Sequence, residues 1–183
     1  MIEEQSFIAA LQSPEEREAA FRELVTTYKE RLYWHIRKIV LDHDDADDVL
    51  QNTFIKIFRN IEKFKGDSKL YTWMYRIATN ESITFINKKA KKLNITIEEV
   101  KNNAIARLES DVYFEGDEIQ LKLQEAIALL PQQQQLIFTM KYFDDITYEE
   151  LSEILDISVG GLKSSYHIAV KKITEHLKTN ETF

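Results

Sequence analysis

A run of carboxylates, Asp44-Asp45-Ala46-Asp47-Asp48, is the stretch whose residue types most directly suggest chemistry. Carboxylates at the first, second and fifth positions of such a run can hold magnesium, because this ion prefers oxygen ligands. An enzyme that uses magnesium in this way needs a second acidic motif opposite the first. The other Asp pair, Asp144-Asp145, is followed three residues on by Tyr148, so that second motif is missing.

The remaining candidates for catalysis or metal binding are equally weak. The Asp-Asp-x-x-Asp pattern is that of isoprenoid synthases, which are much longer chains, and the chain has no Cys for thiolate chemistry. Its four His residues are dispersed at positions 35, 43, 167 and 176. We interpret His35 as a packing residue in an aromatic helix, and His43 between Asp42 and Asp44 as a surface His rather than a metal ligand. We therefore expect no catalytic residue, no metal and no cofactor, and a protein that is not an enzyme.

The same acidic run is a good start for an amphipathic helix. Carboxylates in a first turn interact favourably with its unpaired N–H groups and with the helix dipole. The apolar residues that follow recur at the spacing of one helical face, namely Leu50, Phe54, Ile57, Phe58 and Ile61. The pattern predicts a helix that runs to about Ile61.

One apolar residue of this helix does not face the core. At about 100° per residue, Ile55 points roughly 140° away from Leu50. It shares that side with polar residues, namely Asp48, Gln51, Asn52 and Arg59. An apolar residue inside a polar rim is typical of a protein-docking surface, but a solvated helix face with one exposed Ile is equally compatible with the pattern.

A second helix, predicted over residues 69–89 with Ser68 as its cap, combines groups that suit nucleic acid. Leu70, Met74, Ile77, Ala78 and Phe85 form its apolar side. The other side is polar and leads into a basic end, with Thr72, Arg76, Thr79, Asn80, Ile83, Asn87, Lys88, Lys89, Lys91 and Lys92. Stacking aromatics, amide groups and a cationic flank suit single-stranded nucleic acid, whereas a solvated helix with a basic C-terminal end is the alternative.

Composition favours an all-α protein. The 183 residues include only 4 Gly and 2 Pro, so turn-forming residues are scarce. The N-terminus lacks the pattern of a signal peptide and no apolar run approaches the ~20 residues of a membrane span. We therefore expect a soluble cytoplasmic protein without membrane insertion.

The charge distribution argues against tight nucleic-acid binding by the free chain. Residues 1–93 carry 16 basic and 15 acidic residues, residues 94–117 carry 2 and 6, and residues 118–183 carry 6 and 10. Non-specific affinity comes mainly from counterion release by many Lys and Arg. Any role on DNA must use local patches or a partner that supplies positive charge.

The hydrophobic periodicity divides the chain into two small helical domains. Residues 1–93 form the first, which we expect to include a helix with Ser13 as N-cap and Pro14 at its first position. Residues 94–117 lose the periodicity and are interpreted as a flexible acidic linker, with weak helical turns around 98–108. Residues 118–183 end in a short helix, a three-residue turn over 156–158 and a longer helix from Val159, the pattern of a helix-turn-helix. The short helix begins with a Thr147–Glu150 capping box.

Three segments closely resemble a known family. The runs 47–54, 64–68 and 71–80 are similar to the second conserved region of bacterial sigma factors, in the compact extracytoplasmic-function (ECF) group of the sigma-70 family. Leu130-Pro131 and the segment 146–160 resemble the fourth region of that group. The two matches, their order and the linker between them cover nearly all of the chain.

The resemblance implies a role for each surface. In this family the second region docks on the clamp helices of RNA polymerase, which would assign polymerase binding to Asp48, Gln51, Asn52, Ile55 and Arg59. The following loop and helix capture unstacked bases of the −10 promoter element, matched here by Phe64, Ser68, Trp73, Arg76 and Asn80. Lys88, Lys89, Lys91 and Lys92 would hold phosphates. Core RNA polymerase, promoter DNA and an anti-sigma factor are the implied partners.

The fourth region would place the helix from Val159 in the major groove of the −35 element. Its candidate DNA-binding residues, in a helix-turn-helix that begins at Tyr148, are Gly161, Lys163, Ser164, Ser165, His167, Ile168, Lys171 and Lys172. Relatives usually carry Thr and Arg where this chain has Gly161, Ser165 and Ile168. We therefore predict −35 recognition through phosphates, DNA shape and a thymine methyl on Ile168. A stand-alone helix-turn-helix regulator is the alternative, but it leaves the first 93 residues without a role.

Overall fold

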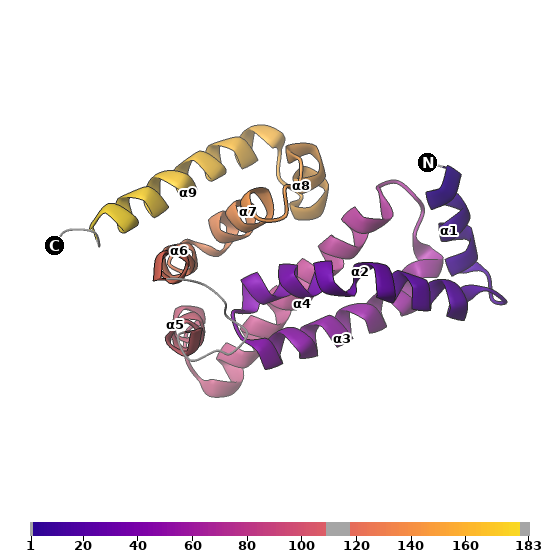
Figure 1. Cartoon of the computed structure of the whole chain (residues 1–183), viewed down its shortest axis with the longest axis horizontal. Helices are drawn as coiled ribbons and strands as arrows, with labels where there is room; N and C mark the ends of the chain where they lie inside the picture. Colours follow the sequence, from indigo (N-terminus) through magenta and orange to yellow (C-terminus); the bar gives the residue numbers. More distant parts are fainter. Residues whose placement is uncertain (1, 109–117, 180–183) are drawn as a thin grey trace.

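The computed structural model describes residues 2–108 and 118–179, and every regular element in those residues is helical (Figure 1). This confirms the all-α class. Along the chain the elements are α1 (Ile2–Gln12), α2 (Arg17–Val40), α3 (His43–Asn60), a 3-10 turn (Ile61–Lys63), α4 (Leu70–Leu93), α5 (Ile97–Leu108), α6 (Glu118–Ala128), α7 (Gln132–Tyr142), α8 (Tyr148–Leu155) and α9 (Val159–Thr179). None of these helices has the length and apolar character needed to cross a membrane.

Helices α2, α3 and α4 pack on one another and form the N-terminal body together with α1. Most of the apolar face predicted for the acidic-start helix is confirmed, because Leu50, Ile57 and Ile61 are buried while Ile55 is exposed. Phe58, predicted on the same face, is exposed at its edge. Asp42 is the N-cap of α3, and its side chain accepts a hydrogen bond from the N–H of Asp45 at 3.0 Å. The cap fixes where this helix starts.

Two helix starts differ from the prediction. Helix α2 begins at Arg17 rather than at Pro14, and its N-cap, Glu16, makes no side-chain cap hydrogen bond. The Ser13 hydroxyl instead donates to the Glu15 carboxylate at 2.9 Å. Ser68 does not cap α4, which begins at Leu70. The N–H of Leu70 instead donates to Glu4 Oε1 of α1 at 2.9 Å, so a carboxylate from another helix does the capping.

Sharp helix ends are made by residues other than Gly. Leu41, Asn94, Asp145 and Asp156 have positive φ values of 65°, 54°, 49° and 57°. Each ends a helix or lies in the turn after one, where a left-handed residue satisfies carbonyls of the last turn. Leu41 is also buried, so the link between α2 and α3 is both tightly turned and packed.

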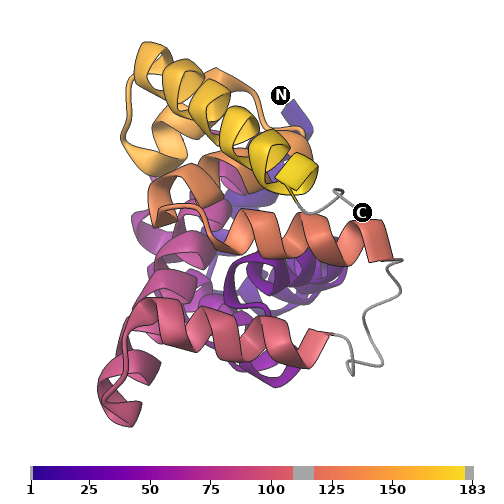
Figure 2. The same cartoon turned by 90° about the vertical axis from the view of Figure 1, so that its left-hand side faces the viewer.

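The segment 94–117, interpreted from the sequence as a linker with weak helical turns, contains a continuous helix, α5, as far as residue 108. A capping box starts it: the Thr96 N–H donates to Glu99 Oε2 at 2.6 Å, and the Glu99 N–H donates to the Thr96 hydroxyl at 3.1 Å. Helix α5 packs on α4 and lies beside α6 (Figure 2).

The C-terminal body consists of α6 to α9 and contains the predicted helix-turn-helix. The Thr147–Glu150 capping box opens α8, and the Ser158 hydroxyl accepts a bond from the Gly161 N–H at the start of α9. A separate apolar cluster from α6, α7 and α9 holds this body together, with Ala126, Ile127, Leu130, Phe138, Ala169 and Ile173 as its buried members.

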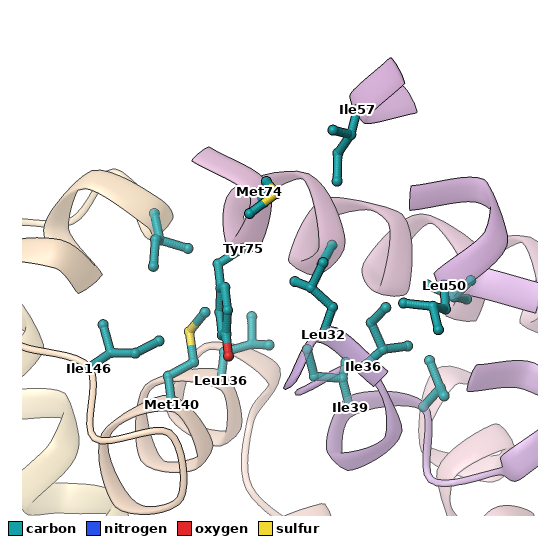
Figure 3. Packing of buried hydrophobic residues seen from close by; sticks show 14 of the residues in the cluster. Leu32, Ile36, Ile39, Leu50, Ile57, Met74, Tyr75, Leu136, Met140 and Ile146 are labelled. Atoms are coloured by element: carbon teal, nitrogen blue, oxygen red, sulfur yellow. The ribbon is translucent and has the colours of Figure 1, made fainter. Parts of the chain in front are cut away.

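The two bodies pack against each other. Helix α8 lies on α4 and α7 contacts α2. A single buried apolar cluster extends from Leu32 and Ile36 of α2 through Tyr75 of α4 to Leu136 and Met140 of α7 (Figure 3). Thr72 and Thr79, predicted on the exposed polar face of α4, are therefore buried.

Candidate functional site

The outward stripe of α3 is fully presented to solvent. Asp48, Gln51, Asn52 and Arg59 are exposed, and the Ile55 side chain is 41% exposed. Phe58 lies beside the stripe, with the Arg17 guanidinium 4.2 Å above its ring. The opposite face of α3 is buried, so this surface is free to contact another molecule without disturbing the core.

The acidic run that opens α3 serves the fold. Asp42 caps the helix, and Asp45 forms an ion pair with Lys89 of α4. Burial raises the pKa of Asp45, and the Lys89 ammonium acts against that rise. Within residues 2–108 and 118–179 no group of three or more His, Asp or Glu side chains is arranged to hold a metal ion.

Four of the residues matched to −10 recognition line one cleft of about 470 Å³: Phe64, Ser68, Trp73 and Arg76. The rings of Phe64 and Trp73 are 5.1 Å apart, and Phe64 itself is buried. The cleft is also lined by Ser152 and Glu153 of α8 and by Asp156, the residue that ends this helix.

The other residues assigned to the −10 element lie elsewhere on α4. Asn80 is exposed and lines a separate cleft of about 200 Å³, whose other residues include Gln133 of α7 and Ile154 of α8. Lys88, Lys91 and Lys92 are exposed near the C-terminal end of α4, whereas Lys89 is half-buried against Asp45. The structure thus separates the base-capture residues from the basic cluster along one helix.

Sequence reasoning missed the residues of α1 that position this loop. Gln12 Nε2 donates to the carbonyl oxygens of Ile61 and Phe64, at 3.0 and 2.8 Å. Glu4 caps α4 directly after the loop. These contacts join segments about 50 to 65 residues apart, so no local sequence pattern could have indicated them.

The outer face of α9 carries the residues assigned to the −35 element. Lys163, Ser164, His167, Lys171 and Lys172 are exposed, the Ile168 side chain is 44% exposed, and Gly161 and Ser165 are half-buried. All three lysines already have neighbours: Lys172 Nζ donates to Gln134 Oε1 at 3.1 Å, Lys171 Nζ lies 3.9 Å from Glu175 Oε1, and Lys163 lies 5.6 Å from the centre of the Tyr148 ring. Leu162, Ala169 and Ile173 hold the inner face in the core.

Comparison with known proteins identifies the two bodies. The family model for Sigma-70 region 2 matches residues 24–92, and the model for Sigma-70, region 4 matches residues 120–173. The ECF RNA polymerase sigma-E factor of Haemophilus influenzae is 30% identical over 153 residues, which cover 79% of this chain and 80% of that protein. This chain belongs to the ECF group of the sigma-70 family.

Further relatives agree with this membership. The ECF RNA polymerase sigma factor SigW of Bacillus subtilis is 29% identical over 167 residues, which cover 87% of this sigma factor and 89% of that protein. The region 2 match disfavours the alternative of a stand-alone helix-turn-helix regulator. The chain is a transcription initiation factor.

Two solved structures share the fold. CnrH, in complex with the cytosolic domain of CnrY, is 18% identical with a TM-score of 0.71 and covers 97% of this chain and 99% of CnrH. RpoE of Bartonella quintana, in complex with the anti-sigma factor NepR, is 19% identical with a TM-score of 0.67 and covers 86% of this chain and 96% of RpoE.

The ionisation of Glu150 makes the stability of the fold depend on pH. Burial raises its pKa, but hydrogen bonds from Tyr71, Lys69 and Thr147 outweigh burial and lower the pKa to about 2. Because the folded-state pKa is depressed, the stabilisation by the ionised carboxylate is complete above about pH 4.5 and is lost as the pH falls toward 2. Urea unfolding between pH 6 and pH 3 is expected to show a larger loss of stability in the wild type than in Glu150→Gln.

Glu149→Gln is the matched control, because Glu149 is the exposed neighbour in the same helical turn. It is expected to keep the wild-type pH profile. Parallel profiles for the wild type and Glu150→Gln would contradict the assignment.

Proposed function

We propose that this sigma factor binds core RNA polymerase through the outer face of α3 and selects promoters with α4 and α9. The observation that carries the proposal is the occurrence of regions 2 and 4 in order on one chain. The chemistry of transcription then belongs to the polymerase, and this chain is not an enzyme. Its place of action is the cytoplasm.

The docking role assigned to α3 rests on its chemistry. The exposed Ile55 supplies apolar area, while Asn52 and Arg59 supply donors around it. An apolar centre with a polar rim is the usual anatomy of a protein interface. Because the other face of α3 lies in the core, a polymerase bound here would hold the N-terminal body rigidly.

Base capture at the −10 element is assigned to the cleft at the start of α4. Trp73 offers an aromatic face, Arg76 a guanidinium, and Ser68 a hydroxyl. Such groups recognise unstacked bases by stacking and by hydrogen bonds to base edges. Lys88, Lys91 and Lys92 then contact phosphates, and Lys89 joins them on release from Asp45.

Recognition of the −35 element is assigned to the exposed face of α9. Lys163, Lys171 and Lys172 provide phosphate contacts, and Ile168 provides an apolar surface for a thymine methyl. Without Arg on this face, fewer bidentate contacts to guanine can form.

The proposal includes the domain division and a protein partner. Residues 1–93 act as region 2, residues 94–117 as the acidic connection, and residues 118–183 as region 4. The RpoE structure is a complex with an anti-sigma factor, and we extend that kind of partner to this chain. Run-off transcription with core polymerase on a promoter pool tests the whole proposal. A stand-alone regulator would not make core polymerase start transcription at these promoters.

Asn52→Asp with Ile55→Lys is expected to weaken binding of core polymerase by at least about 100-fold, because a new charge buried at an interface anchor is costly. Binding is measured by fluorescence anisotropy, and folding by circular dichroism. Asn103→Asp with Ala106→Lys, a pair with the same spacing on the exposed side of α5, is the matched control. Wild-type transcription by the α3 variant would refute the clamp assignment.

Asn80→Ala is expected to reduce promoter opening about tenfold while polymerase affinity stays within about twofold, because the amide is assigned to a base edge. Permanganate reactivity of unpaired thymines measures opening. Asn102→Ala on α5 should leave both quantities unchanged. Equal losses of opening and of polymerase binding would argue against base capture.

A promoter-library selection is expected to return a −35 motif that is not dominated by guanine. Ile168→Ala should weaken the preference for thymine within it by about tenfold or less. Val170→Ala, at another partly exposed apolar position of α9, serves as the control. A guanine-dominated motif read by α9 would contradict this assignment.

A further inference from the structure

The turn between α7 and α8 inserts one carboxylate into the N-terminal body. The Asp144 side chain is only 6% exposed. Its Oδ2 accepts a hydrogen bond from His35 Nδ1 at 2.9 Å, and its Oδ1 accepts one from Lys38 Nζ at 2.7 Å. Both donors belong to α2, more than 100 residues away in the sequence, so a single side chain ties the two bodies together.

The donors are held in place from their own side. The fully buried His35 ring lies with Nε2 2.9 Å from the Thr79 hydroxyl of α4 and packs on the Tyr75 ring. Burial raises the pKa of Asp144, but the hydrogen bonds and charges of His35 and Lys38 outweigh burial and keep the pKa below its ordinary value. The site therefore suits an ionised carboxylate.

A second ion pair joins the bodies at the edge of the −10 cleft. Lys69, the residue before α4, lies 2.9 Å from Glu150 of α8. Beyond it, Glu153 and Asp156 of α8 line the cleft that also contains Lys63, Lys65 and Arg76. Carboxylates thus stand opposite the cations that would otherwise meet DNA phosphates.

This packing narrows the surface to which we assigned base capture. Residues of α8 line the Trp73–Arg76 cleft, and residues of α7 and α8 line the cleft at Asn80. Because α8 borders both clefts, a DNA strand that runs along α4 from Trp73 to Asn80 meets α8. We infer that full strand capture requires the C-terminal body to leave the N-terminal body.

We propose that this closed arrangement is an autoinhibited state of the free chain, latched by Asp144 between His35 and Lys38. The inference rests on the proposed function for its consequence at the promoter, but the latch itself is a property of the chain alone. Opening exchanges two charge-assisted bonds for water and exposes the apolar contact of Tyr75 with the C-terminal body.

The contact also contains an element that limits its stability. Lys101 of α5 is buried and its ammonium donates to the side-chain oxygen of Gln135 of α7, a neutral acceptor. Burial lowers the pKa of Lys101, and the charge of Glu98 opposes this fall only in part, since a buried cation is unfavourable. The Asp144 latch therefore holds the closed state against the unfavourable free energy of the buried Lys101 ammonium. A closed state of limited stability suits a protein that must open.

The test compares Asp144→Asn with Asp145→Asn. Asp145 is adjacent, its side chain is 97% exposed, and its backbone is left-handed, a conformation that Asn tolerates. The two variants change net charge equally, but Asp144→Asn alone removes a buried ionic partner. Because the chain has no Cys, spin labels at Glu23→Cys and Thr174→Cys, on exposed positions of α2 and α9, report the separation of the bodies specifically.

Double electron–electron resonance on the free chain is expected to give one short distance for the wild type and for Asp145→Asn. Asp144→Asn should raise the population at longer distances about tenfold or more, the usual effect of losing hydrogen bonds to a charge. Lys38→Met removes one of the two donors to Asp144 from a partly exposed position and should open the chain to a smaller extent. This variant keeps the test decisive if Asp144→Asn fails to fold. Unchanged distances in the folded variants, or equal opening in Asp145→Asn, would overturn the latch.

Binding of single-stranded −10 DNA, with the sequence selected from the promoter pool, connects the latch to function. The free Asp144→Asn variant is expected to bind this strand about tenfold more tightly than the wild type. If the distances lengthen but the wild type supports no transcription with core polymerase, the proposed function fails and the latch stands. If the wild type transcribes and the distances do not change, the latch fails and the proposed function stands.

Discussion

The structure depends on one continuous burial of apolar surface, from α2 through α4 into α7. Leu32, Ile36 and Tyr75 of the N-terminal body are fully buried in the same cluster as Leu136 and Met140 of α7, beside which Tyr75 lies (Figure 3). Burial of this kind is non-directional and contributes about 25 cal/mol per Å². This burial brings the two bodies together without fixing their relative orientation. The polar contacts at the edge of the apolar cluster fix that orientation.

Those polar contacts explain how an acidic chain uses its charges. The net charge of −7 opposes DNA, yet one acidic residue of α8, Glu150, and one of the α7–α8 turn, Asp144, face the N-terminal body. Lys69 and Lys38 find Glu150 and Asp144 there. The same carboxylates that close the molecule would repel a phosphate backbone, so closure and weak DNA affinity have one electrostatic origin.

Local patterns predicted part of the local structure. The Thr147–Glu150 box and the turn before Val159 were identified from residue types and spacing, because short-range hydrogen bonds decide them. The caps expected at Ser13 and Ser68 were wrong, since at Leu70 a carboxylate from a distant helix does the capping. The Thr96–Glu99 box carries the same signal, and attention to it would have predicted α5. The burial of Thr72 and Thr79 could not be predicted, since a polar helix face reveals nothing about a second body that packs on it. The partnership of His35 with Asp144 likewise joins residues without any local relationship.

The left-handed ends of the helices have a mechanical consequence. Leu41 joins α2 to α3 through a turn that is buried as well as tightly wound, and a non-Gly residue keeps this costly conformation only where its surroundings fix it. Helices α2, α3 and α4, which pack on one another, should therefore move as one rigid unit. Any large displacement of the C-terminal body must then be taken up after α4, where α5 is a capped helix that packs on α4.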